Sequence, residues 1–148
     1  MSTVRSMRPG PMISIAIVDT GPLVAAANRA DPDHGPCLEA LRSRDYSLVI
    51  PALCVAEATY LIGRGQGPRI EALFVRSLES FDVQAPVGEE WLRIAELVEI
   101  YSDFPLGGND ASVVALAERL ETDLVVTLDR RHFSTVRPRH VEQLRLLP

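Results

Sequence analysis

The sequence contains no lysine, and its 15 basic residues, all arginine, stand against 20 acids for a net charge of −5. Without lysine a phosphate-binding P-loop is excluded, and the glycine-rich segment 63–67 also lacks a preceding strand. Aromatic residues make up only 5% of the chain, so Val, Ile, Leu and Ala must form the core. There are two cysteines, Cys37 and Cys54, and both lie in helix-like apolar patterns, which favours reduced core thiols over a disulfide framework.

Long hydrophobic runs are also missing. The apolar run after Met12 is too short for an export signal, and Pro51 and Glu57 interrupt the most hydrophobic stretch, 46–63, so it is not a membrane span. A chain of 148 residues without repeats or linkers fits one compact domain. We expect a flexible N-terminal extension over residues 1–11, one domain over residues 12–148, and a cytoplasmic protein with no membrane partner.

Strand-like and helix-like patterns alternate along the chain. Strands are expected at 13–18, 47–50, 81–84 and 124–128, with a short fifth strand at about 141–144. Helices are expected from residue 21 and over 32–44, 51–64, 68–80, 89–102 and 109–121. Nearly apolar strands separated by helices predict an α/β fold with a mostly parallel sheet of four or five strands, covered by helices on both faces. Ligands in such folds gather at the carboxyl ends of the strands.

Four carboxylates stand at positions where an acid is unexpected. Asp19 closes the first strand, Asp129 follows the last clear strand, Asp110 opens a helix, and Glu57 lies on an apolar helical face. Carboxylates that converge repel one another and lose hydration, unless a cation offsets the cost. An oxygen-only set without a nearby His or Cys favours a hard cation, so convergence predicts a site for Mg²⁺ or Mn²⁺.

Each acid also has a structural explanation that the sequence leaves open. Asp19 can cap the turn into the next helix, and Asp110 can be an N-cap, although Asn109 is equally able. Asp129 can belong to an Asx turn, and Glu57 can pair with an arginine. The three histidines lack the spacing of metal ligands: His34, His132 and His140.

The net negative charge argues against a nucleic-acid partner, but the distribution of charge weakens this argument. If a metal covers four of the 20 acids, the remaining 16 nearly balance the 15 arginines. Residues 130–148 carry five arginines and one acid, Glu142. Because a guanidinium binds phosphate through two parallel hydrogen bonds, this segment suits a phosphodiester substrate. For any single arginine, an ordinary solvated surface remains the alternative.

Four motifs resemble one known family. They are V-D-T-G-P-L at 18–23, A-E-A at 56–58, N-D-A-S-V-V-A-L-A-E-R-L at 109–120 and T-L-D-R-R-H-F at 127–133. In this order they resemble PIN-domain ribonucleases and, more narrowly, the VapC toxins of bacterial type II toxin–antitoxin pairs. The resemblance extends from about residue 13 to 141, and the last two motifs are its most specific part.

The resemblance implies a single PIN-like domain with a metal-dependent endoribonuclease site that uses Mg²⁺ or Mn²⁺ to hydrolyse RNA phosphodiester bonds. The implied catalytic and metal-binding quartet is Asp19, Glu57, Asp110 and Asp129. Thr20, Thr127 and Asn109 would support these acids, and Arg130 and Arg131 would contact the RNA backbone. Asp103 is a weaker candidate for an outer ligand, and we do not expect it to be one.

The resemblance also implies protein partners. VapC-like proteins usually form homodimers and are held inactive, in a larger complex, by a small VapB-like antitoxin in an apolar groove. Helical segments 23–27, 37–41 and 52–62 are candidates for this groove, with an ordinary core and dimer face as the alternative. Two other functions stay open, a structure-specific DNA nuclease of the same metal chemistry and a non-catalytic PIN-like binding protein. The segment V-D-T-G at 18–21 also resembles the active-site turn of aspartic proteases. Those proteases are all-β and pair two such turns, whereas this chain is rich in helices and has one, so a protease is disfavoured.

Overall fold

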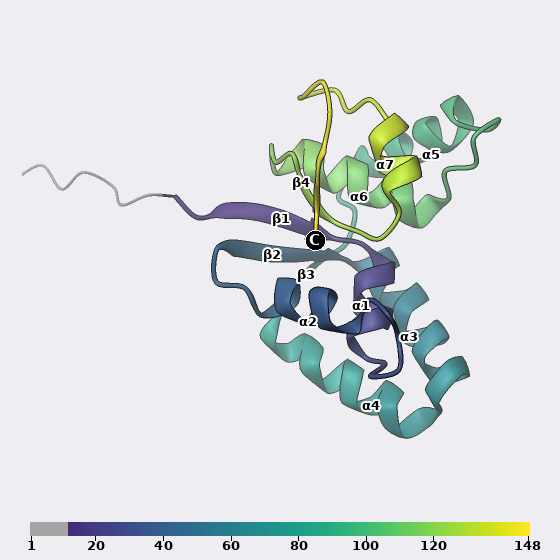
Figure 1. The fold of residues 1–148 in the computed structure, drawn as a ribbon. Helices are drawn as coiled ribbons and strands as arrows, with labels where there is room; N and C mark the ends of the chain where they lie inside the picture. Colours follow the sequence, from purple (N-terminus) through teal and green to yellow (C-terminus); the bar gives the residue numbers. More distant parts are fainter. Residues whose placement is uncertain (1–11) are drawn as a thin grey trace, which may run out of the picture.

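The computed structural model describes residues 12–148. Within them, five strands form one parallel sheet in the order β3-β2-β1-β4-β5 (Figure 1). The strands are β1 (Ser14–Val18), β2 (Tyr46–Pro51), β3 (Asp82–Gln84), β4 (Leu124–Val126) and β5 (Arg145–Leu147). The helices are α1 (Thr20–Ala26), α2 (His34–Arg42), α3 (Ala52–Gln66), α4 (Pro68–Ser77), the 3₁₀ turn η1 (Leu78–Ser80), α5 (Glu90–Ile100), α6 (Gly108–Arg119) and α7 (Arg130–Thr135).

Helices cover both faces of the sheet, with α1 to α4 on one side and α5 and α6 on the other (Figure 1). Side chains of β1 alternate between the two layers, since Ala16 and Val18 belong to the core under α1, α3 and α4, whereas Ile17 belongs to the core under α5 and α6. A segment buried on both faces must be nearly all apolar, as residues 15–18 of β1 are. The expected α/β fold with a parallel sheet is confirmed.

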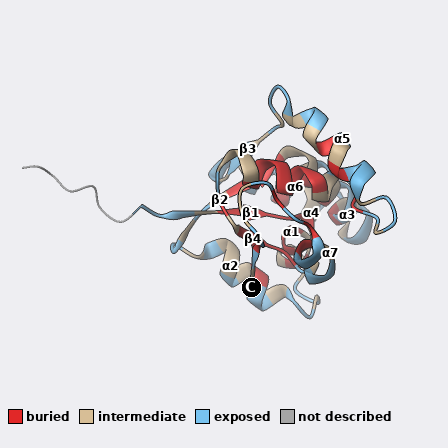
Figure 2. Cartoon of the chain, turned by 90° about the horizontal axis from the view of Figure 1, so that it is seen from above, coloured by how far each residue is buried: buried red, intermediate tan, exposed pale blue. Residues whose placement is uncertain are grey.

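Helix α6 is the most deeply buried helix on its side of the sheet. Every residue from Ala111 to Ala117 is buried, and Figure 2 shows this stretch in red beside the strands. Small side chains allow the helix to pack closely against β1, β2, α3 and α5. The first turn of α6, which carries Asp110, is therefore held firmly against the sheet.

Two elements differ from the sequence-based expectation. The fifth strand was expected at about 141–144, and this was wrong: β5 spans Arg145–Leu147, where Arg145 pairs with Leu124. The chain cannot join the sheet earlier because Arg139 and His140 are bound to Glu118 and to the carbonyl of Thr122. The short helix α7 was not expected at all.

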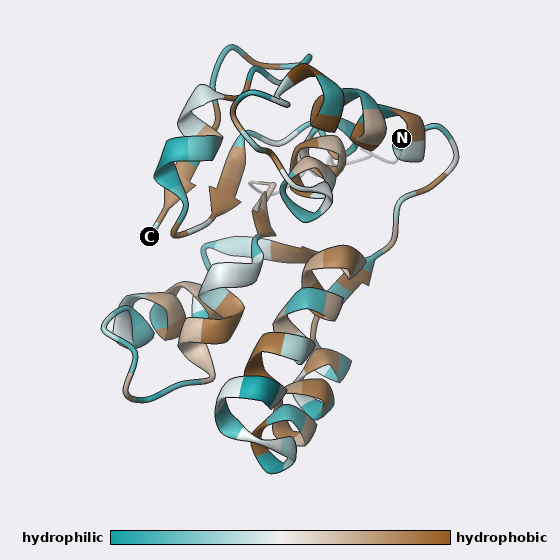
Figure 3. Cartoon of the chain, turned by 90° about the vertical axis from the view of Figure 1, so that its right-hand side faces the viewer, coloured by the Kyte–Doolittle hydropathy of each residue, from teal (hydrophilic) through white to brown (hydrophobic). Residues whose placement is uncertain are grey.

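The remaining expectations concern the chain ends, the thiols and membrane segments. The proposed extension, residues 1–11, lies outside the described residues. Cys37 and Cys54 are both buried and free, as expected. No helix within residues 12–148 combines the length and apolarity needed to cross a bilayer. The central strands are mainly hydrophobic, whereas the helices carry both hydrophobic and hydrophilic residues (Figure 3).

Candidate active site

Asp19 lies where β1 and β4 end side by side. Val18 pairs with Val126, and the backbone N–H of Asp19 donates to the Val126 carbonyl at 2.9 Å. The next residue of the neighbouring strand, Thr127, donates its hydroxyl to Asp19 Oδ2 at 2.8 Å. The backbone N–H of Thr20 donates to Asp19 Oδ1, also at 2.8 Å, at the start of α1. The carboxylate is therefore oriented by two donors and is only 5% exposed.

This environment disfavours the charge on Asp19. Burial raises its pKa from 3.8 to about 6, although the hydrogen bonds from Thr127 and Thr20 act in the opposite direction. The negative charges of Asp110 and Asp129 raise it further. Asp19 is thus more than a helix cap, because it is a buried acid whose closest charged neighbours are other acids.

Asp129 is the N-cap of α7 and is joined to Asp19 through Thr127. Its Oδ1 accepts the backbone N–H of His132 at 3.0 Å, and its Oδ2 lies 2.7 Å from Nδ1 of the His132 ring. The Asp129 backbone N–H donates to Thr127 Oγ1 at 2.9 Å. One hydroxyl thus donates to Asp19 and accepts from Asp129, which sets the spacing of the two acids.

Asp110 occupies the first turn of α6, but it is not the N-cap, which is Gly107. The backbone N–H of Gly107 stabilises the ionised carboxylate, as the third helical residue of a capping box does. Burial and the charge of Asp129 nevertheless raise the Asp110 pKa, with a smaller contribution from Glu57 and an opposing one from His132. Asp110 therefore combines a structural role with membership of the acidic cluster.

Helix α3 brings Glu57 to the edge of this cluster. Its side chain is half-buried, and no ion pair to it is recorded within residues 12–148, so the expected structural alternative of an arginine partner is not seen. One turn earlier, Cys54 lies beneath the acids, with Sγ 4.0 Å from Asp19 Oδ1 and 3.9 Å from the Asn109 carbonyl. Burial, followed by the charge of Asp19, raises the pKa of Cys54 to about 12 and keeps it a neutral thiol.

Asn109, expected as a supporting residue, contributes its backbone carbonyl to these contacts. This oxygen accepts the hydroxyl of Ser112 at 2.6 Å. Thr20 was also expected to support the acids, and its buried hydroxyl has no hydrogen-bond partner among the described residues. A buried hydroxyl without a partner is costly, so this atom is an unsatisfied polar group in the residue next to Asp19.

The donor set can be compared with what a cation requires. Within residues 12–148, no three His, Cys, Asp or Glu side chains lie close enough to hold a metal ion as they stand. The chemistry of the donors nevertheless fits a hard cation, because their side-chain ligands are carboxylate oxygens and neighbouring acids raise the pKa values of Asp19 and Asp110. Mg²⁺ keeps several of its own waters, so such a site does not need many protein ligands.

The short helix α7 carries the two arginines expected to contact RNA. Both are exposed: Arg130 donates to the Pro148 carbonyl at 2.6 Å, and the Arg131 guanidinium lies over the Phe104 ring, 4.9 Å from its centroid. The same ring lies 4.6 Å from the ring of His132. Reasoning from the sequence dismissed His132 for lack of ligand spacing, but its position three residues after Asp129 was the available signal.

Comparison with known proteins shows the family to which the chain belongs. The family model for the PIN domain matches residues 16–137, a range that contains all four acids. The chain belongs to the PIN-domain family. Among curated proteins it is 36% identical over 124 residues to Ribonuclease VapC26 of Mycobacterium tuberculosis, covering 82% of this chain and 92% of that protein, so its relatives within the family are VapC proteins.

Solved structures show the same fold at lower sequence identity. M. tuberculosis VapC20, described as a sarcin–ricin loop cleaving toxin, matches with a TM-score of 0.68 at 19% identity over 76% of this chain and 87% of its own. Rickettsia felis VapBC2, bound to a promoter DNA fragment, matches with a TM-score of 0.65 at 18% identity, over 90% of this chain and 99% of its own. A toxin–antitoxin complex from Klebsiella pneumoniae matches with a TM-score of 0.62 at 19% identity, over 82% of this chain and 92% of the matched chain.

Proposed function

We propose that this chain is a metal-dependent endoribonuclease that acts as the toxin of a VapBC-type toxin–antitoxin pair. One observation carries the proposal: at the carboxyl end of a parallel sheet, burial and the charges of Asp110 and Asp129 raise the pKa of Asp19, and burial and the charge of Asp129 raise that of Asp110. The similarity to a protein named Ribonuclease VapC26 selects RNA as the substrate class. Since no arginine within residues 12–148 pairs with these four acids, their arrangement suits a cation better than it suits a structural role.

In this proposal Asp19, Glu57, Asp110 and Asp129 hold Mg²⁺ or Mn²⁺. When bound, the metal would act as a Lewis acid on the scissile phosphate and would lower the pKa of a bound water toward neutral pH, so that hydroxide is available. The protein's part is to orient the carboxylates. Thr127 links Asp19 to Asp129, and the N–H of Gly107 fixes Asp110.

The RNA backbone is proposed to cross α7. Arg131 is exposed, and its guanidinium lies over the Phe104 ring, which also contacts the ring of His132, the partner of Asp129. Arg130 uses one of its five donors on the Pro148 carbonyl, which leaves others for phosphate. Both side chains are exposed, and a phosphate would bind them through paired hydrogen bonds.

A groove of about 880 Å³ is proposed to receive the antitoxin. Helices α1 and α2 line it, as expected, but its opposite wall is α4, and α3 contributes only Gln66 among its lining residues. The floor is apolar, with Leu23, Leu41 and Phe74, while several arginines also line the groove: Arg29, Arg42 and Arg69. This pattern fits an amphipathic antitoxin segment that inserts apolar side chains and presents acids to the arginines.

A homodimer is also part of the proposal. Helix α5 exposes large apolar side chains that a second copy would cover, since Trp91 is 53%, Leu92 73% and Ile100 59% exposed. Clusters of this kind mark interaction surfaces more often than scattered single residues do. The proposed compartment is the cytoplasm, where an RNA substrate and an antitoxin partner would both be present.

The first test is cleavage of total RNA by the purified protein with Mg²⁺ or Mn²⁺, beside an EDTA control and Asp19→Asn. The asparagine keeps the acceptor for the Thr20 N–H but removes the charge, so the fold should survive or become slightly more stable while cleavage is lost. Discrete fragments that need both the metal and Asp19 support the proposal.

The same assay separates the rival functions. A duplex and a single-stranded DNA substrate, run in parallel, identify a DNA nuclease of the same chemistry. Metal binding without cleavage of either nucleic acid identifies a non-catalytic binding protein. An Asp19→Asn variant that unfolds would show that the acid mainly caps α1, and a folded wild type that binds no metal contradicts the mechanism.

A further inference from the structure

The ring of His132 contacts the acidic cluster without belonging to the expected quartet. We infer that His132 is a positioning residue that fixes the carboxylate of Asp129 through its Nδ1–H. The inference rests on the proposed function and adds to it a residue that sets the geometry of the fourth acid. It is carried by two hydrogen bonds, one ring contact and the position of α7.

His132 holds both oxygens of a single carboxylate. Its backbone N–H donates to Asp129 Oδ1 at 3.0 Å, and its ring Nδ1 lies 2.7 Å from Oδ2. An ionised carboxylate only accepts hydrogen bonds, so Nδ1 must carry the hydrogen. The neutral ring is therefore in the Nδ1–H form, whereas free imidazole side chains in water favour hydrogen on Nε2.

The ring itself is held from its other side. Phe104, in the segment between α5 and α6, lies 4.6 Å from the His132 centroid with the planes inclined by 40°. The Arg131 guanidinium lies 4.9 Å from the centroid of the same Phe104 ring. The tilted contact with Phe104 favours one orientation of the His132 ring, and the cation–π contact from Arg131 holds Phe104 itself in place. His132 thus joins α7 to the chain segment that leads into α6 and Asp110.

The hydrogen bonds leave Asp129 able to bind a further ligand. Each carboxylate oxygen has two lone-pair directions, and His132 occupies one on each. The last torsion of an aspartate is soft, so a carboxylate held only by the helix cap rotates over a broad range. The second bond, from the ring, removes this rotation and aims the remaining lone pairs in one direction.

A purely structural role predicts something different. The backbone N–H bond alone caps α7, and any residue at position 132 can make it. If the ring served only to pack on Phe104, its loss would lower stability and leave metal affinity unchanged. The positioning role predicts a change in affinity that follows the Nδ1 donor and not the size of the ring.

The test compares His132→Leu with His132→Asn in the full chain, with Mn²⁺ affinity measured by titration calorimetry. Leucine keeps apolar bulk but removes the donor, whereas the amide nitrogen of asparagine can occupy the place of Nδ1. Partners that orient metal ligands typically contribute 10–100-fold, so we expect leucine to weaken Mn²⁺ binding by about 10-fold and asparagine by less than about threefold. The inference is overturned if His132→Leu binds Mn²⁺ as tightly as the wild type, or if His132→Asn binds it as weakly as His132→Leu.

A second readout does not depend on metal. Nitrogen-15 NMR of the metal-free protein, at a pH where the imidazole is neutral, is expected to show His132 with its hydrogen on Nδ1. Asp129→Asn should abolish that preference, while Phe104→Leu should retain it. If the wild type binds no Mn²⁺, the proposed metal chemistry fails and this spectrum alone decides the inference; hydrogen on Nε2 in the wild type overturns it.

Discussion

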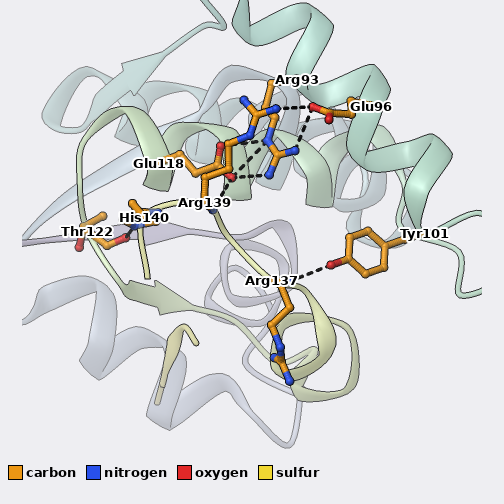
Figure 4. Close-up of polar contacts among 8 residues, drawn as sticks. All are labelled: Arg93, Glu96, Tyr101, Glu118, Thr122, Arg137, Arg139 and His140. Atoms are coloured by element: carbon orange, nitrogen blue, oxygen red, sulfur yellow. Dashed lines mark hydrogen bonds and ion pairs between the residues drawn. The ribbon is translucent and has the colours of Figure 1, made fainter. Parts of the chain in front are cut away.

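Two groups of acids in this molecule have opposite surroundings. In the network that joins α5, α6 and the segment before β5, every carboxylate meets an arginine (Figure 4). Arg93 binds Glu118 at 2.7 Å and Glu96 at 3.0 Å, and Arg139 binds Glu96 at 2.7 Å. At the carboxyl end of β1 and β4, the acids Asp19 and Asp110 meet other acids instead.

The two environments shift pKa values in opposite directions. The hydrogen bond from Arg93 lowers the pKa of Glu96, and the bond from Arg145 lowers that of Asp123. Burial raises the pKa of Asp19 to about 6 and also raises that of Asp110. Paired acids therefore stabilise the fold at neutral pH, whereas the clustered acids destabilise it, which is typical of a site organised for a ligand.

The paired network has an identifiable structural task. The backbone N–H of Arg137 donates to the Tyr101 hydroxyl at 2.8 Å, and His140 Nε2 lies 2.7 Å from the carbonyl of Thr122 (Figure 4). Together with the Arg139 contacts, these bonds hold the chain against α5 and α6 before it enters β5. The difference between the regions is one of role, since one positions the chain and the other is proposed to position a metal.

The largest expected effect is on catalysis, and it is tested by changing one aspartate to asparagine in each of the two regions. Asp110→Asn should lower kcat/KM for RNA by about 100-fold or more, because metal-assisted charge stabilisation is worth several kcal/mol. Its matched control is Asp123→Asn, which neutralises the acid at the opposite end of β4 and should leave kcat/KM unchanged. Steady-state kinetics on a defined RNA measures both. Equal losses would mean that the distinction between the regions has no catalytic meaning.

Breaking the paired network should affect stability instead. Glu118→Gln leaves the guanidinium of Arg93, whose side chain is 10% exposed, without its closest carboxylate. Because Glu96 still faces Arg93 in this variant, the expected loss is at most about 3 kcal/mol, the cost of removing one partner of a buried pair. Urea denaturation measures this loss, and RNA cleavage under native conditions should remain at the wild-type rate. A variant as stable as the wild type would show that the network is not needed to hold the segment before β5.

The sign of the pH dependence distinguishes the regions next. The Asp19 pKa of about 6 in the folded state exceeds its ordinary 3.8, so between these values the folded protein holds a proton that the unfolded chain has lost. The resulting stability is present below pH 4 and is lost as the pH rises through 6, by at most about 3 kcal/mol.

Denaturation of the metal-free protein from pH 4 to pH 7.5, as the difference between wild type and Asp19→Asn, isolates this contribution. Glu96 and Asp123 change stability in the opposite direction, but both proteins contain them, so they cancel. A difference that grows in favour of the wild type as the pH rises would contradict the buried, repelled carboxylate.

The smallest expected effect is the rescue of the clustered acids by a cation. Mg²⁺ at a hundredfold its Kd adds about 2.7 kcal/mol, which corresponds to a rise in Tm of about 5–10 °C for a domain of this size. Differential scanning calorimetry should show the rise at pH 7.5 and a smaller one at pH 5, where Asp19 is protonated. Asp123→Asn should keep the rise and Asp110→Asn should lose it. No rise with saturating Mg²⁺ or Mn²⁺ would remove the metal from the proposal.

Most of the fold could be predicted from local patterns. The runs that became β1 and α6 are recognisable because burial on both faces requires nearly continuous apolar residues. The acids were recognisable for the converse reason, since a carboxylate at the end of such a run is costly without a purpose. The short helix α7 was missed because six residues are too few to show helical periodicity.

The bounds of the last strand and the walls of the groove differed from local reasoning because they depend on distant contacts. The last strand begins at Arg145 and not at Val141 because Arg139 and His140 are bound elsewhere. The wall of the groove formed by α4 depends on how α4 packs against α3. Such pairings have no signature in the spacing of the residues that make them.

By itself, the sequence determined the alternation of strands and helices, the parallel sheet and the identity of the acids, because these follow from apolar periodicity and from the free energy of burying charge. Only the tertiary structure decided that Thr127 links two of the acids, that His132 holds Asp129 and that Glu57 has no arginine partner among residues 12–148. Those contacts depend on strand register and helix packing, which place residues more than a hundred positions apart, such as Asp19 and Thr127, within 2.8 Å.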